Sequence, residues 1–250
     1  MYNDIFKEEK NKCDILFSQE YENYKRFIQN NNMPAYNIEY IENIDDISYI
    51  MRTTTYTNPM SLMVNLGYIL LSECKNFEPT LYHEFTHMWD SYNLFTNKNI
   101  NDKKKVLFLY TEYHASIIEF YKFIKLENVN TKCKIEEYQK YPYWNKKYTP
   151  QEFLQDKIEL VYEFSENYKK SKTPKSYIQL LQSIMYVWGT IDAYNNINDS
   201  NLSISLPRTI FDKYLKILHK VFKLNCLDDR VFDAILKLNK LLDNTFKSDV

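Results

Sequence analysis

The spacing of apolar residues along the chain predicts a mostly helical protein. Between residues 4 and 30, apolar positions recur among charged ones at the spacing of an amphipathic helix. Pro150 and Pro174, each preceded by Thr, mark two further helix starts, because proline fits the first helical turn and threonine caps it. The same patterns predict helices over about 102–124, 150–170, 174–194, 207–223 and 229–246.

A different pattern predicts β-strands before residue 75. Residues 36–41 alternate Tyr and Ile with polar partners, residues 49–56 are rich in Thr and aromatic residues, and residues 62–71 form a largely apolar run. Flanked by turn-forming residues, these segments predict three or four short strands. We expect the run 62–71 to be an edge strand, along which an extended peptide could pair.

The fold class that follows is α+β, mostly α, with a small sheet at about 35–75 packed on a helix that begins at Pro79 or Thr80. Residues 127–148 are polar and predict a loop. We therefore predict a core at 1–127, which includes the N-terminal helix, and a helical C-terminal part at 128–250 packed with it as one unit. A chain of 250 residues is long enough for such a core.

Composition narrows the range of partners. The formal net charge is -1, so there is no general attraction to nucleic acid or to an anionic membrane. Only 2 glycines are present, which excludes Gly-rich phosphate-binding loops. No apolar run reaches the ~20 residues of a membrane span. The 4 scattered cysteines and the polar N-terminus favour a reduced, cytoplasmic protein. The abundance of Asn, Lys, Ile and Tyr is typical of an AT-rich bacterial or phage genome.

The clearest chemistry lies in His83-Glu84-Phe85-Thr86-His87, which reads H-E-x-x-H. Residues four apart lie on one face of a helix, so two imidazoles at this spacing can bind one Zn²⁺. The Glu beside the first His can take a proton from a metal-bound water. An apolar stripe on the same helix, which includes Leu81 and Met88, is expected to face the core, while His83 and His87 lie on another face.

A catalytic zinc needs a third protein ligand, and Glu112 is the best candidate. It lies 25 residues after His87 on the next predicted helix, where the small Ala115 would allow close approach. The metzincin pattern is excluded, because neither its Gly nor its third His follows His87. His114 and Asp192 are the rivals. His114 points about 200° away from Glu112 round the helix, and Asp192 lies in a Gly-Thr-Ile-Asp segment similar to the zinc-binding element of aspzincins.

The pair His83/His87 together with Glu112-x-x-Ala115 resembles the gluzincin pattern. Within that group it is similar to the compact bacterial and phage metallopeptidases of the ImmA/IrrE type. The resemblance covers about residues 50–120 and leaves the helical C-terminal part unmatched. It implies a zincin-type active-site helix, zinc at His83, His87 and Glu112, and Glu84 as the general base.

These features predict a zinc metalloendopeptidase, a hydrolase that cleaves a protein or peptide substrate. The alternative is a non-catalytic or regulatory zinc-binding protein that acts as a protein-binding module through its helical C-terminal part. For Asp90 we favour a solvated charge over a hydrogen bond to a ligand histidine, and we expect His219 on the surface. A tyrosine near the metal could stabilise an oxyanion; the candidates are Tyr92, Tyr110, Tyr186 and Tyr194.

Overall fold

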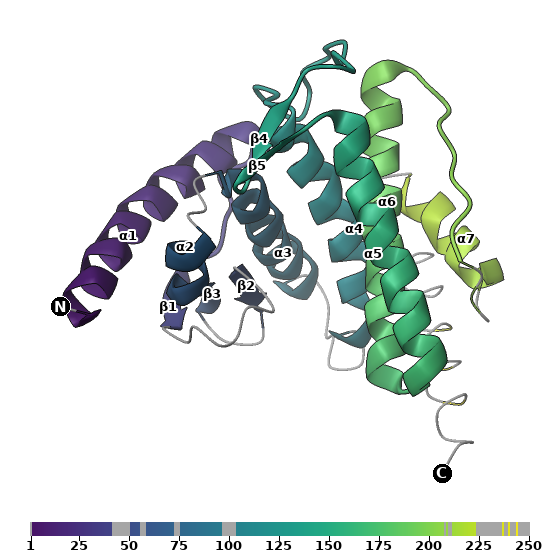
Figure 1. Ribbon diagram of the computed structural model, residues 1–250, viewed down its shortest axis with the longest axis horizontal. Helices are drawn as coiled ribbons and strands as arrows, with labels where there is room; N and C mark the ends of the chain where they lie inside the picture. The colour runs from purple at the N-terminus through teal and green to yellow at the C-terminus, as the bar shows by residue number, and fades with distance from the viewer. Residues whose placement is uncertain are drawn as a thin grey trace. The chain divides into compact units, whose positions relative to one another are not determined.

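The computed structural model has the predicted α+β, mostly α architecture: most elements are helices, and a small mixed sheet is formed near the N-terminal end of the chain (Figure 1). It forms two compact units: unit 1 is Met1–Asn97 with Ile118–Pro150, and unit 2 is Lys98–Ile117 with Gln151–Val250. The predicted boundary after residue 127 stays a prediction. The structure describes residues 2–41, 51–55, 59–72, 76–96, 104–207, 209, 212–223 and the single residues 237, 240 and 244. The helix predicted at 229–246 therefore lies outside the described residues, apart from those three.

The sheet of unit 1 has the strand order β1-β3-β2. Strand β3 (Met60–Asn65) is central: β1 (Tyr36–Ile41) is parallel to it and β2 (Met51–Thr54) is antiparallel. The prediction that 62–71 is an edge strand is therefore wrong. The run divides into the end of β3 and a helix, α2 (Leu66–Ser72). Its apolar character reflects burial in the centre of the sheet, whose described outer strands are β1 and β2.

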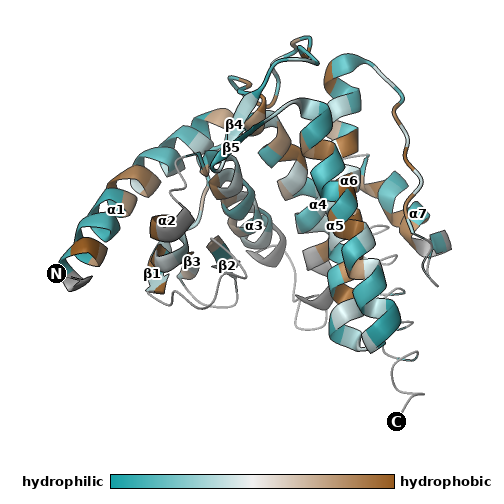
Figure 2. Cartoon of the chain, in the orientation of Figure 1, coloured by the Kyte–Doolittle hydropathy of each residue, from teal (hydrophilic) through white to brown (hydrophobic). Residues whose placement is uncertain are grey.

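Helix α1 (Tyr2–Phe27) packs against α3 (Glu78–Thr96), the helix that carries the H-E-x-x-H motif. Tyr24 is fully buried, and burial raises the pKa of its hydroxyl well above the usual value, so the group stays a donor. Its Oη lies 2.9 Å from Oγ1 of Thr86, which in turn donates to the Tyr82 carbonyl at 2.8 Å. Hydrophilic and hydrophobic residues alternate along α1 (Figure 2), as expected for a helix that buries one face.

A hairpin in unit 1 replaces part of the loop predicted at 127–148. Strands β4 (Tyr141–Tyr143) and β5 (Lys146–Tyr148) pair antiparallel, and Trp144 takes a left-handed conformation, with φ of 55°, in the turn. The Trp144 amide donates to the Asn76 carbonyl at 2.8 Å, and Asn76 Nδ2 donates back to the Trp144 carbonyl at 2.9 Å. These two hydrogen bonds fix the hairpin beside the segment that leads into α3.

Unit 2 is built from helices. They are the first part of α4 (Lys104–Phe123), α5 (Pro150–Ser171), α6 (Pro174–Asn198) and α7 (Asp212–Phe222). The starts predicted at Pro150 and Pro174 are confirmed. At the second one, Thr173 caps the helix, because its side chain accepts a hydrogen bond from the Ser176 amide at 3.2 Å.

Asp192 of α6 links three helices of unit 2. Its Oδ2 accepts from Tyr113 Oη at 2.7 Å and lies 2.7 Å from His219 Nε2, and its Oδ1 lies 2.7 Å from Lys223 Nζ. The prediction that His219 is a surface residue is wrong. Its side chain is 21% exposed and its ring stacks on Trp188, with 4.4 Å between centroids and 9° between planes.

We expect Asp192→Asn to destabilise the protein at neutral pH and to matter less in acid. Burial by itself raises the pKa of Asp192, but hydrogen bonds from His219, Lys223 and Tyr113 outweigh it and leave this pKa below its usual value. A lowered folded-state pKa stabilises the fold above the unfolded value of ~3.9, and this stabilisation is lost as the pH falls through the folded-state pKa. Urea unfolding at neutral pH and below pH ~3 will measure the difference. A wild-type advantage that is equal at both pH values would contradict the ionic role.

Candidate metal centre

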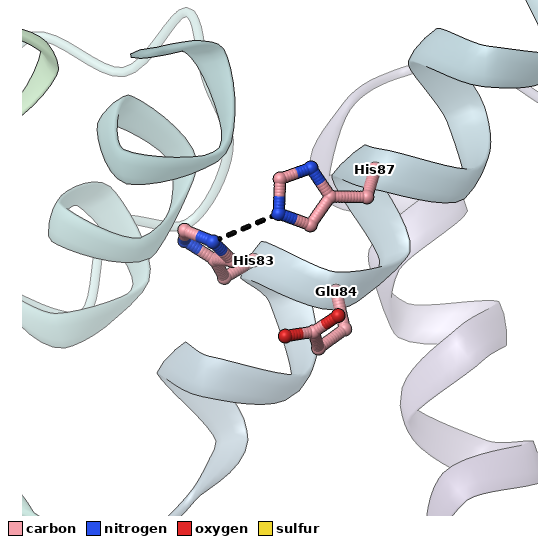
Figure 3. A group of neighbouring side chains, drawn as sticks. All are labelled: His83, Glu84 and His87. Carbon is pink, nitrogen blue, oxygen red and sulfur yellow. Dashed lines mark hydrogen bonds between the residues drawn. The ribbon is translucent and has the colours of Figure 1, made fainter. Parts of the chain in front are cut away.

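Helix α3 directs two imidazole nitrogens at one point. His83 is 8% exposed and His87 is partly exposed, and their Nε2 atoms are 3.0 Å apart (Figure 3). The arrangement follows from their spacing of four residues on one helix face. Two nitrogens bound tetrahedrally at the usual Zn–N distance of ~2.0–2.1 Å would be about 3.3 Å apart. The observed separation of the two nitrogens is therefore close to that of two histidines bound to one zinc ion.

Glu84 completes this group. Its carboxylate and the two histidine rings offer ligand atoms that all lie within 4.8 Å of one another. Edge strand β2 holds Glu84 from the other side: the Thr53 amide donates to Oε2 at 2.7 Å, and Thr53 Oγ1 donates to the Glu84 carbonyl at 3.1 Å. Glu84 is buried, with 8% of the residue exposed. It is thus oriented by a backbone amide rather than left to rotate in water.

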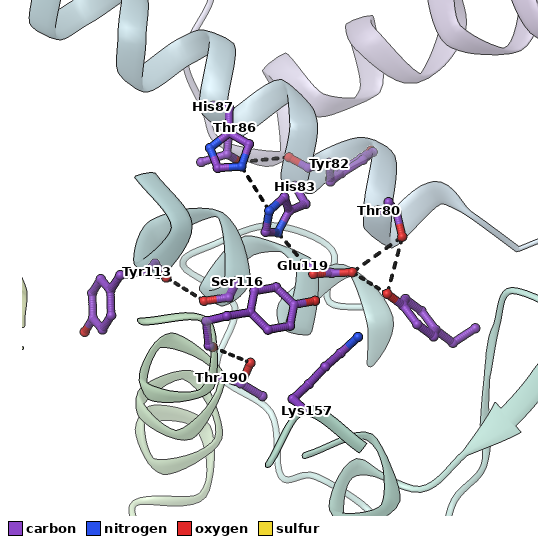
Figure 4. A network of polar contacts seen from close by, with 12 residues as sticks. Thr80, Tyr82, His83, Thr86, His87, Tyr113, Ser116, Glu119, Lys157 and Thr190 are labelled. Carbon is purple, nitrogen blue, oxygen red and sulfur yellow. Dashed lines mark hydrogen bonds and ion pairs between the residues drawn. The ribbon is translucent and has the colours of Figure 1, made fainter. Parts of the chain in front are cut away.

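Glu119 supports His83, a role that was not predicted from the sequence. Its Oε2 lies 3.1 Å from Nδ1 of His83, and the residue is 2% exposed (Figure 4). A carboxylate on one ring nitrogen fixes the orientation and tautomer of an imidazole, so that the other nitrogen, here Nε2, can bind a metal. One signal was available in the sequence: Glu119 follows Glu112 by seven residues, two helical turns along the same face of α4.

The β4–β5 hairpin holds Glu119 in place. Tyr143 Oη donates to Glu119 Oε1 at 2.6 Å, and Trp144 Nε1 donates to Thr80 Oγ1 at 3.0 Å. Thr80, in the first turn of α3, lies 3.5 Å from the same Glu119 oxygen. The hairpin therefore ties the carboxylate that supports His83 to the beginning of the helix that carries it.

The other candidate residues have separate surroundings. Glu112 belongs to unit 2, where its Oε1 accepts from Gln182 Nε2 at 3.3 Å, and its role as third ligand stays a prediction. His114 lies beside the Tyr110 ring, with centroids 5.8 Å apart. The carboxylate of Asp192 is held in the network described above. Asp90 is 3% exposed, so its interpretation as a solvated charge is wrong. The four tyrosine candidates for oxyanion stabilisation stay predictions.

Comparison with known proteins identified no similar protein. No protein-family model matches the sequence, and neither a curated protein nor a solved structure matches it. Among the described residues, no helix combines the length and apolar character that crossing a membrane requires. The site is therefore interpreted from its own chemistry. Two imidazole nitrogens with a neighbouring carboxylate form a donor set that suits zinc, as well as other borderline transition metals.

Proposed function

We propose that the protein is a zinc-dependent metallopeptidase, in which His83 and His87 bind the metal and Glu84 is the general base. The observation that carries the proposal is the convergence of the two Nε2 atoms while Nδ1 of His83 faces the buried Glu119 carboxylate. Metal-binding histidines nearly always have such a partner on their second nitrogen. Glu112 is the proposed third ligand. A cytoplasmic location and a protein or peptide substrate belong to the same proposal and rest on the composition and the motif.

Each residue has a defined role in this proposal. Bound zinc would lower the pKa of its water towards ~7 and polarise the substrate carbonyl. Glu84 takes the proton of the attacking water and passes it to the leaving amine, so the carboxylate ends as it began. The Thr53 amide, 2.7 Å from Oε2, keeps that carboxylate in one orientation during the transfer. Glu119 keeps Nε2 of His83 available as the ligand atom.

We expect Glu84→Gln to abolish peptide cleavage while leaving metal binding unchanged. Glutamine has the same size and its amide oxygen can still accept from the Thr53 amide, but it cannot take up a proton. Loss of a general base costs on the order of 10²-fold or more in rate. Wild type and variant are to be incubated with a proteome-derived peptide library, with new peptide ends identified by mass spectrometry and zinc measured in both samples.

Two results would count against the proposal in different ways. Cleavage by Glu84→Gln at the wild-type rate would show that Glu84 is not the base. A wild-type protein that holds zinc and yields no new peptide ends would favour the alternative, a non-catalytic zinc-binding protein that recognises a partner. His114→Ala is the matched control, because it removes another partly buried histidine without touching the proposed ligands.

A further inference from the structure

A cavity of about 450 Å³ lies within unit 2, lined by residues of α6, of the segment 202–207 that leads from α6 towards α7, and of α7 and its end. Its volume falls in the range of small-molecule sites, ~300–1,000 Å³. One part of the wall is apolar and includes Ile184, Ile191 and Leu215. Trp188 adds a flat aromatic surface, extended by the His219 ring stacked on it. This part of the cavity suits a flat apolar ligand body.

The polar part of the wall is anchored in the core of unit 2. Asp192, His219 and Lys223 all line the cavity, and Asp192 is 3% exposed. Tyr113 and His219 both contact Oδ2 of Asp192, while Lys223 contacts Oδ1. These contacts fix the position of Lys223 at the cavity wall even though half of its side chain, 50%, is exposed.

The described part of the lining holds two carboxylates and two lysine ammonium groups, which differ in what they leave open to a ligand. Both acidic residues of the described lining accept hydrogen bonds within the protein: Asp192 as described above, and Asp212 through Oδ1, which accepts from the Thr209 amide at 2.6 Å and from Thr209 Oγ1 at 2.9 Å. Among the described lining residues, the cations are Lys216, which is exposed, and Lys223. An ammonium group has three N–H donors, and the ion pair with Asp192 leaves Lys223 others to offer.

We propose that this cavity binds a small organic anion, namely a carboxylate carried on a flat apolar body. The ligand carboxylate pairs with Lys223, and the apolar body lies against Trp188 and the isoleucine side chains of α6. The site belongs to unit 2 alone and does not depend on the proposed metallopeptidase activity.

Two probes with the same ring system and opposite charge test the proposal. The full-length protein is to be titrated by calorimetry with indole-3-acetate, an anion, and with tryptamine, the corresponding cation. We expect saturable binding of indole-3-acetate to one site and at least about tenfold weaker binding of tryptamine. Equal binding of the two, preferred binding of tryptamine, or no saturable heat with either probe would overturn the proposal.

Two lysine variants, one at the end of α7 and one within it, test whether Lys223 makes the contact with the ligand carboxylate. Lys223→Met should weaken indole-3-acetate binding about tenfold, whereas Lys220→Met, which removes an exposed lysine outside the cavity lining, should leave it unchanged. Unchanged affinity in Lys223→Met would overturn the assignment. If circular dichroism shows that Lys223→Met is unfolded, wild-type binding decides the matter: it should weaken as NaCl rises from about 50 to about 500 mM, and salt-independent binding would count against an ionic contact.

Discussion

Replacing His83 or His87 by alanine is expected to abolish stoichiometric zinc binding by the purified protein. The two Nε2 atoms are 3.0 Å apart and are the only imidazole nitrogens in the metal-binding group among the described residues. Removal of either leaves too few ligands, because a catalytic zinc site uses three protein side chains. Metal content by plasma mass spectrometry after dialysis should fall from about one zinc per chain to the background. The control His114→Ala should keep its zinc.

Replacing Glu119, whose carboxylate supports His83, is expected to weaken zinc binding and not to abolish it. Glu119→Gln should weaken zinc binding by ~10–100-fold, the usual effect of losing such a partner, without abolishing it. Glu112→Ala identifies the third ligand: loss of zinc supports the gluzincin-like assignment, and retention shows that another group supplies the third donor. A wild-type protein that takes up no zinc after reconstitution would contradict the metal centre as a whole.

The second large effect is expected from Gly189→Ala, which should destabilise unit 2. A Cβ at this position of α6 would overlap both Oγ of Ser116 and the carbonyl of Tyr113 in α4. Ser116 Oγ itself donates to the Tyr113 carbonyl at 2.8 Å, so the side chain and the backbone there are coupled. Overpacking of this kind costs ~1–3 kcal/mol, and more where backbone atoms must shift.

The sign of the change makes this a sharp test. At an unobstructed helical position, alanine in place of glycine stabilises by ~0.5–1 kcal/mol. Urea unfolding followed by circular dichroism should show the opposite for Gly189→Ala, while Asn196→Ala, at an exposed position on the same helix, should change the free energy of unfolding little. A stabilised Gly189→Ala protein would mean that α4 and α6 are further apart than described.

The sequence predicted correctly those features that depend only on neighbouring residues in the chain. Pro150 and Pro174 predicted two helix starts, because the ring restricts the backbone wherever it lies in the fold. The spacing of four predicted that His83 and His87 share a face, since helix geometry alone decides it. In the predicted apolar stripe of the same helix, Leu81, Phe85 and Met88 are fully buried and Tyr92 is partly buried.

The errors concern features that depend on distant parts of the chain. An apolar run such as 62–71 does not reveal by its period whether it is a strand or a buried helix, and the structure divides it into both. His219 has charged neighbours in sequence, but its partner Asp192 is 27 residues away. The role of Glu119 is set by its contacts with His83, on another helix, and with Tyr143, in a hairpin where a loop was predicted. Such roles are set by packing, which no local pattern encodes.

The interleaving of the two units also constrains how such a chain could have been assembled. Unit 1 consists of two segments separated by Lys98–Ile117, and unit 2 begins inside that gap and resumes after Pro150. One contiguous segment therefore cannot carry either unit by itself, because any segment that spans all of unit 1 also contains Lys98–Ile117 of unit 2. Of the proposed metal centre, His83 and His87 precede that segment, the proposed ligand Glu112 lies in it and Glu119 follows it, so a stretch of chain that carries all four also carries the α4 residues of unit 2.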